Sequence, residues 1–192
     1  MLRTTYDWAM RMAQTRHALW ILALISFIES SVFPIPPDVL LIPMVLARPH
    51  RAWLIAGVCT VASVAGGFAG YAIGLFLYEA VGQPVLAFYG YLDRFTEFQA
   101  LYNEWGAWIV AGAGATPFPY KVITIASGVT QLDPAVFAVA SVLSRGARFF
   151  LVAALLWKWG PPMRAFIERR LGLLVTLGFV LLLGGFLALR LL

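Results

Sequence analysis

Long apolar stretches, separated by short polar segments, dominate the pattern along the chain. Charge-poor stretches cover residues 18–47, 52–78, 106–132, 134–157 and 171–189. A helix needs about 20 apolar residues to cross ~30 Å of hydrocarbon. The second, fourth and fifth stretches therefore each predict one membrane-spanning helix, the fifth being an extra C-terminal span.

Prolines interrupt the other two stretches near their middles. FPIPPD occupies residues 33–38 and TPFPYK occupies residues 116–121. Proline removes a backbone donor and ends a helix, so the pieces on either side are too short to cross a bilayer. We expect two re-entrant hairpins, since irregular backbone at membrane depth is tolerated where protein or a wet cavity covers it. The residues that break the hairpins are Pro34, Pro36, Pro37, Pro117 and Pro119.

The distribution of charge indicates how these segments are oriented. Lys and Arg are frequent in residues 1–17, 48–51 and 158–170. In residues 79–105, by contrast, the charged side chains are mostly acidic. If both broken stretches are re-entrant, all three basic segments lie in the cytoplasm together with the N-terminus, and the acidic segment lies outside. This arrangement satisfies the positive-inside rule. The first hairpin then enters from the cytoplasm and the second from outside.

Two short matches suggest an internal repeat. VASV occurs at 61–64 and at 139–142, and PIPPDVL at 34–40 resembles PFPYKVI at 117–123. The order of hairpin, loop and span is the same in both halves. Since the two hairpins enter from opposite faces, we predict an inverted repeat, as in many transporters.

The repeat defines the expected domain organisation. An N-terminal cytoplasmic or interfacial segment precedes one membrane domain, and a cytoplasmic loop with the C-terminal span follows it. The halves of the membrane domain are joined by one interfacial helix on the outer surface. The boundaries are 1–17 for the first segment, 18–158 for the membrane domain, about 18–80 and 106–158 for its halves, 84–104 for the linker, and 159–192 for the last part.

Composition gives the same fold class. Of 192 residues, 61% are hydrophobic and 12% are charged, with a mean hydropathy of +0.84. Soluble domains carry about 25% charged residues, so we predict an all-α integral membrane protein. The basic balance, with a pI of about 9.7, then reports topology and lipid contact rather than nucleic-acid binding. A lone Cys59 and the absence of hydrolase motifs predict no metal, no cofactor and no enzymatic activity.

Five ionisable residues interrupt the apolar stretches: Glu29, Asp38, Lys121, Arg145 and Arg148. Each is costly at membrane depth, so they must pair, reach the interface or line a wet cavity. Three cations against two anions leave one positive charge for an anionic substrate group. The cations are candidates for binding a substrate phosphate, aided by half-helices that begin at about Asp38 and Lys121. Glu29 and Asp38 are candidates for coupling transport to protons.

Structural explanations of the same residues remain open. Arg145 and Arg148 can simply bridge to Glu29 and Asp38 and hold the fold together. Asp38 can stabilise the dipole of its own helix, and Lys121 can extend its ammonium group to the interface.

The pattern E-x-x-x-x-P-x-P-P-D at 29–38, with P-x-P-Y-K at 117–121 followed by Gly128, resembles the DedA family. These are bacterial inner-membrane proteins related to SNARE-associated, or VTT-domain, proteins, and the YqaA-like branch is most similar. The resemblance implies two opposed re-entrant hairpins, lipid movement that depends on the proton-motive force, and a link to envelope stress. Glu29 and Asp38 fall where the family has its acidic pair. Thr116 and Lys121 stand where better-studied members carry an arginine pair.

The expected function is therefore that of a lipid transporter, a flippase or scramblase of undecaprenyl phosphate or a phospholipid that supports envelope homeostasis. Its expected partners are protons and anionic or phosphate-bearing membrane lipids, and no nucleic acid is expected. Assembly into a homo-oligomer is compatible with the sequence. The alternative is a non-transporting membrane assembly or scaffold protein whose buried charges are structural. An intramembrane enzyme is the weakest reading, because no nucleophile–base pair accompanies the two acids.

Overall fold

The computed structural model describes residues 17–32, 36–116, 118–160 and 162, and among these residues it contains helices and no strand. A 3₁₀ turn (Pro49–Arg51) and a π-helical turn (Tyr78–Gly82) accompany the α-helices. In chain order the α-helices are α2 (Ala18–Ser31), α3 (Asp38–Ala47), α4 (Ala52–Leu77), α5 (Gln83–Tyr89), α6 (Leu92–Ala115), α7 (Tyr120–Val129) and the helix Pro134–Gly160.

Within the described part of the chain, two continuous helices are long and apolar enough to cross a membrane, judged by length and composition. They cover Pro49–Tyr89 and Pro134–Gly160. The helices predicted at 52–78 and 134–157 are thus confirmed as helices. The predicted span at 171–189 lies outside the described residues, as does nearly all of the N-terminal segment 1–17.

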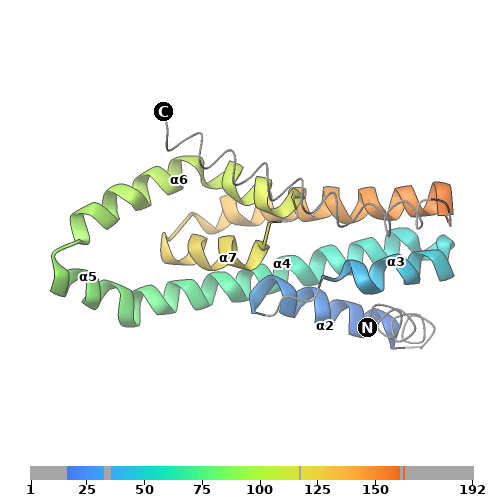
Figure 1. The fold of residues 1–192 in the computed structure, drawn as a ribbon, viewed down its shortest axis with the longest axis horizontal. Helices are drawn as coiled ribbons and strands as arrows, with labels where there is room; N and C mark the ends of the chain where they lie inside the picture. Colours follow the sequence, from blue (N-terminus) through green and yellow to red (C-terminus); the bar gives the residue numbers. More distant parts are fainter. Residues whose placement is uncertain (1–16, 33–35, 117, 161, 163–192) are drawn as a thin grey trace.

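The two long helices run antiparallel along the long axis of the molecule (Figure 1). The α2–α3 pair lies along one end of α4, and α6 and α7 lie toward the other end. The end of α2 and the start of α3 lie toward the middle of the molecule, as do the end of α6 and the start of α7, so the two helix pairs point in opposite directions (Figure 1). One apolar core forms around α2, α3 and α4, and a second forms around α6 and α7.

Glycines on α4 allow two hairpin helices to approach its backbone closely. A Cβ atom on Gly66 would collide with the backbone of Phe27 in α2, and one on Gly74 would collide with the backbone of Ile125 in α7. Gly128 in α7 faces the backbone of Tyr71 in the same way. Small residues permit such approach between apolar helices, and α4 is therefore the element that joins the two hairpins.

The segment 84–104 differs from the prediction, because it is not one helix. The chain leaves α4 through the π-helical turn into α5, reverses at Gly90 with φ of 69°, and then begins α6 at Leu92. The left-handed conformation at Gly90 ends α5, since glycine adopts it without a steric penalty. Val85 and Phe88 therefore lie on a different helix from Leu92. The 24 residues of α6 also supply the first arm of the second hairpin.

Candidate functional site

The proline breaks place the ends of four helices. In the first hairpin α2 ends at Ser31 and α3 begins at Asp38, and in the second α6 ends at Ala115 and α7 begins at Tyr120. The half-helices expected at about Asp38 and Lys121 are confirmed to within one residue. Pro36, Pro37 and Pro119 lie in these breaks, whereas Pro34 and Pro117 are outside the described residues.

The two breaks meet in space. Thr124 Oγ1 in α7 donates to the carbonyl of Ser30 at 3.2 Å, and Lys121 Nζ donates to the carbonyl of Val32 at 3.4 Å. Both acceptors lie at the end of α2, where its last carbonyls have no intrahelical partner. The first residues of α7 therefore donate hydrogen bonds to carbonyl groups at the end of α2.

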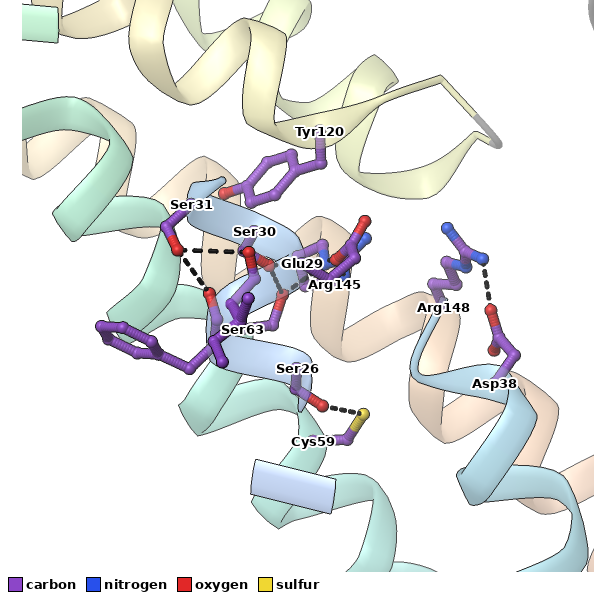
Figure 2. A network of polar contacts seen from close by, with 12 residues as sticks. Ser26, Glu29, Ser30, Ser31, Asp38, Cys59, Ser63, Tyr120, Arg145 and Arg148 are labelled. Carbon is purple, nitrogen blue, oxygen red and sulfur yellow. Dashed lines mark hydrogen bonds and ion pairs between the residues drawn. The ribbon is translucent and has the colours of Figure 1, made fainter. Parts of the chain in front are cut away.

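Two ion pairs connect α2 and α3 to the helix Pro134–Gly160 near this point (Figure 2). Arg145 Nη2 lies 2.8 Å from Glu29 Oε2, and Arg148 Nη2 lies 2.7 Å from Asp38 Oδ2. The two arginines are three residues apart and so share one face of their helix. Both acids come from the first hairpin, one on either side of its break. The arginines thus bridge to Glu29 and Asp38, as the structural explanation of these charges expects.

The Arg145 guanidinium is enclosed, with 1% of its side chain exposed. Its Nε donates to Ser63 Oγ at 2.7 Å, and Ser63 is in turn 2.7 Å from Ser30 Oγ. The rings of Tyr120 and Phe149 lie 4.9 and 4.7 Å from its central carbon, within the range of a cation–π contact. Arg145 is therefore held by a carboxylate, a hydroxyl and two aromatic faces.

The Arg148 guanidinium is more open, with 25% of its side chain exposed. Besides Asp38, it donates to the carbonyl of Thr116 through a longer bond of 3.4 Å. Thr116 directly follows α6, so Arg148 reaches the edges of both hairpin breaks. The two arginines share a helix and a residue type, yet their surroundings are different.

Lys121 is the third cation, and it lies partly exposed at the start of α7. Its ammonium group contacts the Val32 carbonyl, and no carboxylate in the described part of the chain lies within ion-pair distance. The five charges predicted to matter thus gather at the two breaks, as two ion pairs and one cation bound to a carbonyl.

A row of small polar side chains next to this site was missed by the sequence analysis. Ser26 Oγ lies 3.0 Å from Cys59 Sγ, one turn away from the contact between Ser30 and Ser63. The sequence signal for this row is a four-residue spacing. Ser26 and Ser30 share one face of α2, and Cys59 and Ser63 share one face of α4. They link α2 to α4 and support Arg145. Within the described residues no cluster of three or more His, Cys, Asp or Glu side chains that could hold a metal is found.

The described fold is thus that of an all-helical protein with two helices suited to a membrane. The chain is 41% identical over 157 residues to an uncharacterized protein of Haemophilus influenzae, covering 82% of this chain and 81% of that protein. It is 39% identical over 169 residues to the "Uncharacterized protein HI0703 homolog" of Histophilus somni, covering 86% and 88%. The chain belongs to the family that these two proteins represent. No family model and no solved structure matches it.

Proposed function

We propose that this protein is an inner-membrane lipid transporter of the DedA type, a flippase or scramblase that moves undecaprenyl phosphate or a phospholipid. The single observation that carries the proposal is the meeting of two opposed, proline-broken hairpins around two ion pairs that join the halves. Transport requires a polar site near the middle of the bilayer, flanked by elements that can move relative to each other.

The outer surface supports a membrane location. Large apolar side chains are exposed on several helices, whereas a soluble protein rarely exposes a large contiguous apolar surface. Examples are Trp20, Leu24, Val61, Phe76, Leu143 and Leu151. In the proposed orientation the N-terminus is cytoplasmic and the α5–α6 turn lies outside, which follows the positive-inside rule.

The opposed hairpins support the inverted repeat. Each is followed in the chain by one of the two long helices, α4 or Pro134–Gly160, and these run antiparallel. A unit of hairpin plus span, repeated with inverted topology, generates this order and these directions.

The charges at the breaks suit a phosphate group more than a neutral one. Arginine binds carboxylate and phosphate with the same planar fork, and Lys121 adds a third cation at the breaks. The lipid tails would remain in the bilayer while the headgroup passes the breaks. Glu29 and Asp38 are the proposed proton carriers, since protonation of either acid removes the charge that holds its arginine.

A second candidate function is a membrane assembly or scaffold protein. The observation in its favour is that both arginines already have carboxylate partners at 2.7–2.8 Å. In this case the charges hold the hairpins together and no substrate enters.

Reconstitution in liposomes tests the proposal. We would follow transbilayer movement of a labelled polyprenyl monophosphate and of a labelled phospholipid, with and without a proton gradient. We expect faster movement than in protein-free liposomes, and loss of this increase in Glu29→Gln with the fold intact. Movement at the wild-type rate in Glu29→Gln would remove Glu29 from the coupling. No movement of either lipid by folded wild-type protein would favour the scaffold function.

A further inference from the structure

We propose that Arg148 and Lys121 form a binding subsite for a phosphate monoester, and that Asp38 occupies the Arg148 part of this subsite when no ligand is bound. Arg145 takes no part in binding. This inference rests on the proposed function. It assigns a structural role to Arg145 and a ligand-binding role to Arg148 and Lys121.

The two arginines differ in exposure and in partners. Arg145 is 1% exposed and its guanidinium is enclosed by Glu29, Ser63 and two aromatic rings. A ligand could reach it only by dismantling the packing of α2 against α4. Arg148 is 25% exposed and, beyond Asp38, has one long bond to a backbone carbonyl and a looser contact with the Phe149 ring, 6.0 Å from its central carbon. Exchange of one anion for another is therefore feasible at Arg148.

Asp38 is the acid that can leave its arginine at the lower cost in free energy. Glu29 Oε2 accepts from both Arg145 and Ser30, whereas Arg148 is the one side-chain partner observed for Asp38 in the described part of the chain. Asp38 is also the first residue of α3. A carboxylate in the first turn interacts favourably with the helix dipole, so Asp38 keeps a stabilising interaction after it releases Arg148.

Lys121 lies, like Arg148, next to the proline breaks of the two hairpins. Lys121 reaches the Val32 carbonyl at the end of α2, and Arg148 reaches Thr116 at the end of α6. Two cations against the single charge of Asp38 leave a net charge of +1 before binding. A phosphate monoester carries between one and two negative charges near neutral pH, so it matches these two cations better than one carboxylate does.

Binding to the purified full-length protein in detergent tests the inference. The probes are a short-chain polyprenyl monophosphate and inorganic phosphate, measured by titration calorimetry. If Asp38 competes for Arg148, Asp38→Asn should bind the lipid phosphate about tenfold more tightly, which is the scale of one charge-assisted hydrogen bond. Arg148→Gln should bind it at least about tenfold more weakly, and Lys121→Gln should also weaken binding.

Matched variants separate this subsite from general electrostatics. Arg94→Gln removes a cation that lies over the ring of Tyr91 on the exposed part of α6. Asp133→Asn alters an acid that accepts from the backbone N–H groups of Ala135 and Val136. Neither should change the affinity for the lipid phosphate. The double variant Asp38→Asn/Arg148→Gln should bind no better than Arg148→Gln, because the gain depends on Arg148.

Several results would overturn the inference. Weaker binding in Asp38→Asn would make Asp38 a positioning residue rather than a competitor, and equal binding would give it no role. No binding of either probe to wild type and to Asp38→Asn would remove the subsite. A loss in Glu29→Gln as large as in Arg148→Gln, with an unchanged unfolding temperature, would contradict the division between the two pairs.

The same measurements separate this inference from the proposed function. Tight binding to Asp38→Asn, in a protein that moves no lipid, would support the subsite and contradict transport. Lipid movement without the Asp38→Asn gain would support transport and overturn the competition of Asp38 for Arg148. Binding of the lipid phosphate alone would support the subsite and indicate a lipid headgroup as its ligand. Equal binding of both probes would support the subsite and indicate that the phosphate group itself is recognised.

Discussion

Two pairs of the same chemical kind occupy different environments in this molecule. Arg145 is enclosed in a packed helix interface, whereas Arg148 is partly open at the hairpin breaks, and the two acids are equally accessible, with 17% of Glu29 and 18% of Asp38 exposed. The environment, rather than the residue type, decides what each arginine can do. A charge whose partners are all internal holds elements together, and one with accessible surface can exchange its counter-ion.

This difference predicts unequal effects on stability. Arg145→Gln leaves the Glu29 carboxylate without its buried partner, so we expect it to lower the free energy of unfolding by about 3 kcal/mol or more. Arg148→Gln should cost about 1 kcal/mol or less, because Arg148 is the more exposed arginine and Asp38 keeps its interaction with the dipole of α3. Unfolding in mixed micelles by increasing fractions of denaturing detergent measures both.

The double variant Glu29→Gln/Arg145→Gln serves as the internal control. It should recover part of the loss, because neither member is then left charged without a partner. Equal losses for Arg145→Gln and Arg148→Gln would show that the two pairs contribute alike and would contradict their division.

At this scale, the sequence identified the charges that meet and offered a bridge between the two arginines and the two acids, but it did not assign each arginine to its acid. Five ionisable residues in apolar stretches identified the group, since each alone is costly. The partner of each acid depends on how α2 and α3 are placed against the helix Pro134–Gly160, and no local pattern specifies that. The hydroxyl of Ser63 beside Arg145 was missed for the same reason, because it comes from a third helix.

At the scale of elements, glycine spacing on α4 sets the approach of the two hairpins. The backbone of α2 lies against Gly66 and the backbone of α7 lies against Gly74. Backbone neighbours cannot rotate away as a flexible side chain can, so an added methyl group must separate the helices. Close packing of these helices is a condition for the ion pairs between the halves.

Gly66→Ala should therefore lower the free energy of unfolding by about 1–3 kcal/mol through overpacking. Gly57→Ala on the same helix is the matched control, since no atom lies within 4 Å of the position that its Cβ would occupy. Alanine there should be neutral or stabilise by up to about 1 kcal/mol through helix propensity. Similar effects of both variants in the same unfolding assay would contradict the close approach of α2 to α4.

Clusters of proline mark element boundaries in this fold, whereas the single Pro43 lies inside α3. The clusters at 33–38 and 116–121 end helices where expected, because several prolines or a proline pair leave no room for a continuous helix. Pro84 does not end the helix that begins before α4. It lies in the first turn of α5, directly after the wide π-helical turn Tyr78–Gly82, where the missing N–H costs little.

At the scale of the whole molecule, the proposed orientation places the two ends of the long axis on opposite sides of a membrane. The turn between α3 and α4 lies at one end and α5 lies at the other (Figure 1). Opposite accessibility of these two positions is therefore a direct consequence of the topology.

Cysteine labelling in cells tests this orientation. Cys59 is buried beside Ser26, and Cys59→Ser provides a background that keeps a hydroxyl partner there. In that background, Phe88→Cys on α5 should react with a membrane-impermeant maleimide in spheroplasts. His50→Cys should react only after the membrane is disrupted. Labelling of both positions from the same side would contradict the orientation.

Lipid movement is the property that the arrangement as a whole is proposed to produce, and the Arg148→Gln variant tests it most directly. Transbilayer movement of labelled polyprenyl monophosphate would be compared in liposomes containing wild type, Arg148→Gln or Arg94→Gln, each checked for its unfolding temperature. We predict that wild type and Arg94→Gln move the lipid and that folded Arg148→Gln loses most of this movement. Wild-type movement in Arg148→Gln, or no movement by folded wild type, would contradict lipid transport through the meeting point of the hairpins.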